Sequence, residues 1–111
     1  MPTDELDERL AHLRFDLNAM IDWEKATGMS VVHLDLDRLA KDLGAQRALL
    51  WAMLKNLDPK RYPQAKDTTM EDAGRLMTLS TMKPITELMV AAIMDGLPLP
   101  TQGAEGEEKK N

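Results

Sequence analysis

The chain has 111 residues, no cysteine and a formal charge of −5, from 19 acidic and 14 basic residues. This length fits one ordinary domain, and without cysteine the chain has neither disulfides nor thiolate metal ligands. A net negative charge does not attract the negatively charged phosphate backbone, so nucleic acid is not an expected partner.

Neither secretion nor membrane insertion is expected. No segment approaches the roughly 20 apolar residues that span a bilayer. The first eight residues include four acids, whereas a signal peptide begins with basic residues and an apolar run. With the absence of cysteine, these features predict a reducing, cytosolic compartment.

Methionine is unusually common among the apolar residues. Hydrophobic residues make up 43% of the chain, and nine of them are Met while four are aromatic. Methionine side chains are flexible and polarizable, so surfaces rich in them repack around different partners. The composition favours a protein that works by binding other proteins.

The N-terminal third predicts an arm, an extended segment and a helix. Leucines recur at helical spacing among acids in residues 4–12, which indicates a weak short helix or a mobile arm. Apolar and polar residues then alternate over residues 13–17, as in a short strand or a packed extended lead-in. Residues 19–27 form a helix that ends at Gly28 and is capped by Asp16 or Asn18. Its core candidates are Met20, Ile21 and Trp23.

The middle of the chain predicts the core. An apolar stripe ends at Gly44, where the chain can bend; its members are Leu36, Leu39, Ala40 and Leu43. Residues 45–57 read as the central helix, because residues 48–54 are apolar on every face and must be surrounded by other elements. Trp51 is therefore expected at the centre of the core. The Asp58-Pro59 pair closes the helix.

The C-terminal part predicts a loop, two helices and a tail. Residues 60–67 read as a surface loop, and Thr68 with Glu71 has the spacing of a capping box for a short helix reaching Thr78. A last helix begins near Pro84 and ends at Gly96. Residues 101–111 carry no large apolar side chain and are expected to be disordered.

The predicted fold class is mainly α: a small helical bundle of four to five helices, with a short strand or extended lead-in near residues 13–17. The expected organisation is an arm over residues 1–12, a helical domain over residues 13–100 and a tail over residues 101–111.

One group of residues resembles a metal site. His33, Asp35 and Asp37 would share one face of an extended segment. A closed site usually needs a fourth ligand or an open water position, and nothing places the other histidine, His12, nearby. An exposed acidic turn is the preferred interpretation, and no metal is expected.

Catalysis is not expected either. The chain has two serines, Ser30 and Ser80, and neither lies in a nucleophile motif. There is no glycine-rich phosphate loop, and the paired carboxylates lie in polar segments where nothing would raise a pKa. We therefore expect no enzyme, no catalytic residue and no cofactor.

A helix-turn-helix is the main structural alternative, because apolar and small residues fall where that motif requires them. These residues are Leu39, Ala40, Leu43, Gly44, Leu50 and Met53. The second helix would have to present polar side chains to the major groove, yet the interior of residues 47–55 is almost wholly apolar. A helix hairpin whose second helix belongs to the core is the preferred interpretation.

The last helix has more apolar surface than one core contact requires. A complete face is formed by Ile85, Leu88, Met89, Ala92 and Ile93. The side chains of Val90, Ala91 and Met94 lie on the other side, where either the N-terminal arm or a partner covers them. The candidate partner-binding residues are Val90, Met94 and Leu97.

The order of segments resembles the tail assembly chaperones of long-tailed, siphovirus-like phages and gene transfer agents. The segments are FDLNAMIDWEKATG at residues 15–28, RALLWAML at 47–54, DP at 58–59 and TMEDAG at 69–74. The resemblance covers about residues 13–97, and its motifs contain no catalytic residue. The charged N-terminal arm and the lysine-rich C-terminus depart from the family pattern.

The resemblance implies a function in tail morphogenesis. In that family, a short helical protein helps tail tube subunits assemble around the tape measure protein in the host cytoplasm, and it is absent from the finished particle. The implied partners are the tail tube protein and the tape measure protein, with self-association of the chain as a further expectation and no role for nucleic acid or membrane. The alternative is a small helical regulatory protein that binds DNA or another protein.

Overall fold

The computed structural model describes residues 6–96, and within them the chain is mainly helical with no strand. The α-helices are α1 (Leu17–Thr27), α2 (Leu36–Ala40), α3 (Leu43–Lys55), α4 (Met70–Leu76) and α5 (Met82–Gly96). Short 3-10 helices η2 (Glu8–His12), η3 (Val31–His33) and η4 (Ala65–Asp67) lie between them. The predicted helical bundle is confirmed, while Leu97 and the predicted tail lie outside the described residues.

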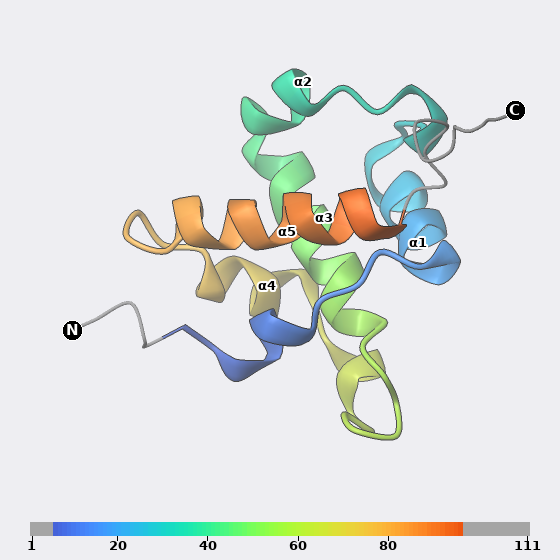
Figure 1. Ribbon diagram of the computed structural model, residues 1–111, viewed down its shortest axis with the longest axis vertical. Coiled ribbons are helices and arrows are strands. Elements are labelled where there is room, and N and C mark those ends of the chain that lie inside the picture. Colours follow the sequence, from blue (N-terminus) through green and yellow to red (C-terminus); the bar gives the residue numbers. More distant parts are fainter. Residues whose placement is uncertain (1–5, 97–111) are drawn as a thin grey trace, which may run out of the picture.

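Helix α3 is the central element of the bundle. Figure 1 shows α3 running through the molecule with α5 crossing it, and α1, α2 and α4 all contact α3. Its buried residues cover most of its circumference: Ala45, Gln46, Ala48, Leu49, Leu50, Ala52, Met53 and Leu54. The prediction that other elements surround this helix is confirmed except on one side, where Arg47 is exposed and Trp51 and Lys55 are partly buried.

Helix α1 ends as predicted and begins two residues earlier than predicted, at Leu17. The Asp16 side chain accepts a hydrogen bond from the Ala19 N–H at 2.9 Å, so Asp16 is the N-cap residue. Gly28 ends the helix in the left-handed conformation at a φ of 75°, which glycine adopts without the steric cost of a Cβ. The residues before the helix are an extended lead-in, whose Phe15 is buried.

The core face of α1 differs from the prediction. Ala19 and Trp23, one helical turn apart, are fully buried, whereas Met20 is partly buried and Ile21 is 40% exposed. Because a helix turns once in 3.6 residues, a contact centred on Ala19 and Trp23 directs Ile21 away from the core. The prediction was correct for Trp23 and wrong for Ile21.

The centre of the core is Trp23, not Trp51. The Trp23 side chain is 1% exposed, and its indole N–H donates to the Ala45 carbonyl at 3.2 Å. Trp51 lies at the edge of the core, where its indole N–H donates to the Thr68 carbonyl and the Lys55 ammonium lies over the ring. A tryptophan needs a partner for its N–H, and Trp51 finds one at the surface of the bundle.

The chain bends between α2 and α3 before Gly44, not at it. The Asp42 side chain caps α3 by accepting from the Ala45 N–H at 3.0 Å, which places Gly44 within the first turn. Of the predicted apolar stripe, Leu39 alone is buried, because α2 is five residues long and contacts α3 through one face. The Gln46 amide holds this contact by donating to two carbonyls at the end of α2.

The predicted capping box exists one residue later than expected. The Thr69 hydroxyl accepts from the Asp72 N–H at 3.1 Å, and the Asp72 carboxylate accepts from the Thr69 N–H at 3.0 Å. Thr68 instead donates its hydroxyl to the Ala65 carbonyl, which ends η4. Because Thr68 and Thr69 are adjacent, the capping box could begin at either residue, and in the structure it begins at Thr69.

Helix α5 buries the face that its sequence predicts. Ile85, Met89, Ala92 and Ile93 are buried, and Leu88 packs against them. The helix begins at Met82, so Pro84 stands in its first turn, where a missing N–H costs nothing. At the other end, a Cβ on Gly96 would overlap the carbonyl oxygen of Phe15, so glycine permits α5 to close against the lead-in to α1.

Replacing Trp23 with Ala should lower the free energy of unfolding by about 3–5 kcal/mol, because the change empties a fully buried site and removes the indole hydrogen bond to the Ala45 carbonyl. Trp51→Ala should cost clearly less, since part of that indole already contacts water. Chemical denaturation followed by far-ultraviolet circular dichroism measures both losses. Equal losses in the two variants would contradict the placement of the core.

Candidate functional site

The outer face of α5 is apolar and open at its C-terminal end. Val90 is half-buried, Ala91 is exposed and Met94 is 48% exposed. The opposite face of the same helix lies in the core, so folding does not require these side chains to be apolar. The structure thus places two of the three candidate residues on one open face, and Leu97 lies outside the described part of the chain.

The N-terminal arm covers part of α5 but leaves this end open. Helix η2 contacts α5, and its Leu10 is fully buried. Figure 1 shows the arm passing beside α5 and α4 before it reaches α1. The arm thus packs on α5, and Met94 remains exposed.

Two apolar side chains in the first half of α1 are also exposed. Leu17 is 68% exposed and Ile21, one turn later, is 40% exposed. The segment before α1 approaches the end of α5, because a Cβ on Gly96 would overlap the carbonyl oxygen of Phe15. We give the exposed and half-buried apolar residues of these two helices one name, the α1–α5 apolar surface: Leu17, Ile21, Val90 and Met94.

Sequence reasoning missed the α1 half of this surface. Leu17 was assigned to the extended segment, and Ile21 was assigned to the core. A helical-wheel projection centred on Trp23 would have placed both on the opposite side of α1. The choice of centre was not available from the sequence, because Met20, Ile21 and Trp23 are all apolar enough for a core.

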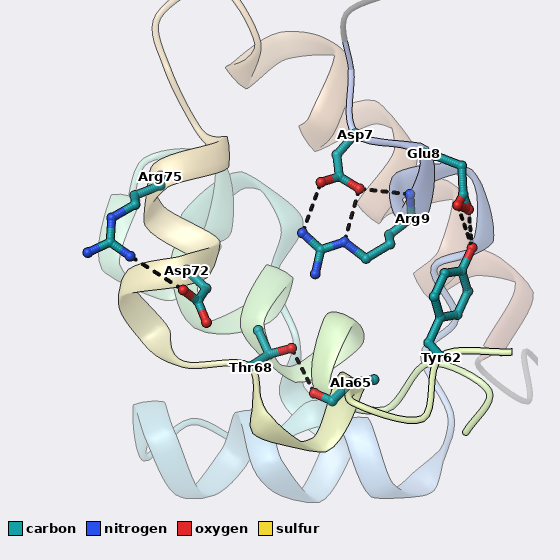
Figure 2. Close-up of polar contacts among 8 residues, drawn as sticks. All are labelled: Asp7, Glu8, Arg9, Tyr62, Ala65, Thr68, Asp72 and Arg75. Carbon is teal, nitrogen blue, oxygen red and sulfur yellow. Dashed lines mark hydrogen bonds and ion pairs between the residues drawn. The ribbon is translucent and has the colours of Figure 1, made fainter. Parts of the chain in front are cut away.

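A polar cleft lies between the arm, the loop after α3 and the start of α4. Its volume is about 450 Å³, and its lining residues are Arg9, Arg61, Tyr62, Pro63, Gln64, Ala65, Asp67, Thr68 and Asp72. Figure 2 shows the Arg9 guanidinium beside Asp7 and the Tyr62 hydroxyl beside Glu8. The cleft contains no group that sequence reasoning had proposed for binding.

The charges around the cleft are largely paired within the chain. Arg9 donates to the two carboxylate oxygens of Asp7, through Nε at 3.0 Å and Nη2 at 2.9 Å. The Tyr62 hydroxyl donates to the Glu8 carboxylate, and Arg61 donates to the same hydroxyl at 3.2 Å. The bond between Tyr62 and Glu8 joins the loop to the arm and helps to hold the arm in place, whereas the bonds between Arg9 and Asp7 lie within the arm.

The pKa shifts of the cleft follow from these bonds. The hydrogen bond from Arg9 lowers the pKa of Asp7, and the Thr69 N–H and hydroxyl lower the pKa of Asp72. Desolvation, together with the Glu8 carboxylate, raises the pKa of Tyr62. All three shifts favour the protonation state that each group already has at neutral pH, so the cleft has no group poised for acid–base catalysis.

His33, Asp35 and Asp37 do not assemble into a metal site. The Asp35 side chain caps α2 by accepting from the N–H groups of Asp37 and Arg38. Within residues 6–96, no three histidine or carboxylate side chains are grouped to hold a metal ion. His12 lies on the arm near Tyr62, far along the chain from His33. The segment is the exposed acidic turn that the sequence favours.

Most of helix α3 lies in the core. A recognition helix presents a row of side chains to the major groove. The exposed positions of α3 are Leu43, Gly44 and Arg47, all near its N-terminus, and Trp51 and Lys55 on the same side as Arg47 are partly buried. The helix pair α2–α3 has the order of a helix-turn-helix, but its second helix packs mainly as a core helix.

No family model, no curated protein and no solved structure matches this chain. None of the helices between residues 6 and 96 combines the length and apolarity needed to cross a membrane.

Leu10→Ala should lower the free energy of unfolding by about 2–5 kcal/mol, because Leu10 is the buried anchor of the arm. Leu17→Ala is the matched control: its side chain is largely in water, and the loss should stay within about 0.5 kcal/mol. Chemical denaturation measures both. A small loss for Leu10→Ala would show that the arm adds little to the fold.

Stability in acid should depend on Asp7 and Asp72. Because the folded chain lowers both pKa values, these carboxylates stabilise the fold above their unfolded pKa of about 4, and the contribution is lost as the pH falls through the folded values. The double variant Asp7→Asn, Asp72→Asn should show a flatter pH dependence of unfolding below about pH 4 than the parent chain. Asp37→Asn, on exposed α2, should retain the parent slope.

Proposed function

We propose that this chain is a phage tail assembly chaperone that binds unassembled tail tube and tape measure proteins in the host cytoplasm. The observation that carries the proposal is the α1–α5 apolar surface, which folding does not require and which a binding protein can use. The resemblance of residues 13–97 to this family supplies the identity of the partners.

The geometry suits binding more than chemistry. The exposed members of the surface are aliphatic or thioether side chains, namely Leu17, Ile21 and Met94, with Val90 half-buried beside them. Such groups offer contact area without catalytic function. Methionine also adapts its shape to different neighbours, which suits a protein that holds more than one partner.

The size of the surface suits reversible binding. Full burial of one such side chain contributes roughly 1.5–3 kcal/mol, and these residues are already partly buried, so each can add on the order of 1 kcal/mol. Part of this gain is lost to the entropic cost of association. A chaperone must release its subunit when the subunit polymerises, and a contact of this strength permits release.

The test is capture of the tail tube protein encoded with this chain. The double variant Val90→Asp, Met94→Lys places two charges on the apolar surface without changing the net charge, so it should abolish capture while the helical circular dichroism is retained. The matched control is Leu79→Asp, Ser80→Lys in the turn before α5, where Leu79 is 96% exposed. It introduces the same charges and should bind as the parent chain does.

Unchanged capture by the α5 variant would refute the assigned surface, and failure of the parent chain to capture either tail protein would refute the function. Position of the gene between those of the major tail protein and a very long tape measure protein would support the function independently.

A further inference from the structure

The outer side of α2 carries charged groups of both signs beside an exposed leucine. A shallow groove lies there, lined by Asp35, Asp37, Arg38, Lys41, Asp42 and Leu43. The Asp35 and Asp42 side chains already accept hydrogen bonds as the N-caps of α2 and α3. Within the described part of the chain, Asp37, Arg38 and Lys41 form no ion pair. Leu43 is 64% exposed, although it opens the central helix.

This groove differs electrostatically from the chain as a whole. Its lining has three acids and two bases, whereas the chain carries a formal charge of −5. Two copies of an acidic chain repel one another on average. Two copies can approach through a surface that carries both acidic and basic side chains, because an acid of one copy can then face a base of the other.

We propose that the α2 groove is a contact between two copies of this chain related by a two-fold axis. Such a contact is isologous: if residue i of one copy contacts residue j of the other, then residue j of the first copy also contacts residue i of the second. Asp37 of each copy faces Lys41 of the other. The two-fold axis therefore produces two ion pairs. Leu43 of each copy packs at the rim of the opposite groove and is removed from water.

The dimer formed in this way is weak and concentration-dependent. Stable interfaces bury about 800 Å² on each partner, and a groove lined by six side chains provides less. Exposed ion pairs add at most about 1 kcal/mol each and are screened by salt. None of the groove residues belongs to the α1–α5 apolar surface, so the inference is independent of the proposed function.

Sedimentation velocity of the full chain tests the dimer. The mass should rise with concentration from 12.5 kDa toward twice that value, and added salt should weaken the association. Leu43→Asp should remain monomeric at every concentration while keeping its circular dichroism, because an acid is favourable in the first turn of a helix. Leu79→Asp, at an exposed position outside the groove, is the matched control and should dimerise as the parent chain does.

A charge exchange identifies the pairing. Asp37→Lys places like charges opposite each other in a dimer, as does Lys41→Glu, so each variant alone should be monomeric. An equimolar mixture of the two restores opposite charges across the axis and should dimerise. A parent chain that is monomeric at every concentration would overturn the proposal, as would unimpaired dimerisation of Leu43→Asp or a mixture that fails to associate.

Discussion

The enclosure of α3 is the constraint on which the rest of the structure depends. The apolar run of this 13-residue helix cannot stand at a surface, so other elements cover most of its circumference. Helices α1 and α4 make the most extensive contacts with it, α2 covers its beginning, and α5 crosses it. Trp23 secures the largest of these contacts by combining full burial with a hydrogen bond to the backbone of α3.

This constraint explains which predictions from the sequence succeed. The existence of the main helices, the end of α1 at Gly28 and the buried face of α5 depend on local patterns, and the structure confirms them. Of the two proposed caps of α1, Asp16 and Asn18, the structure uses Asp16. The choice between Trp23 and Trp51 depends on how α1 and η4 sit against α3, which no local pattern specifies. The same limit applies to the surface: the sequence indicated the α5 half at Val90 and Met94, whereas the α1 half emerges only when Gly96 meets Phe15.

Several polar side chains hold one segment of the chain to another. Gln46 is the buried polar side chain of the core, and its amide ties α2 to α3 through two carbonyls. At the polar cleft, the Tyr62 hydroxyl ties the loop to Glu8 of the arm, and Asp7 and Arg9 pair within the arm (Figure 2). Two features have no evident role in holding the fold together: the α1–α5 apolar surface and the charged side chains of both signs in the α2 groove. These two features are the basis of the proposed binding to other proteins.

The closure between Phe15 and Gly96 also has a consequence for biosynthesis. The two residues stand near opposite ends of the described chain, so their contact closes a very large loop and must form after the local helices. On the ribosome, Leu10 and Phe15 emerge before α5, and their contacts with α5 cannot form until α5 has been translated. The nascent chain therefore exposes these two apolar side chains in the interval, and translation of α5 is the event that shields them.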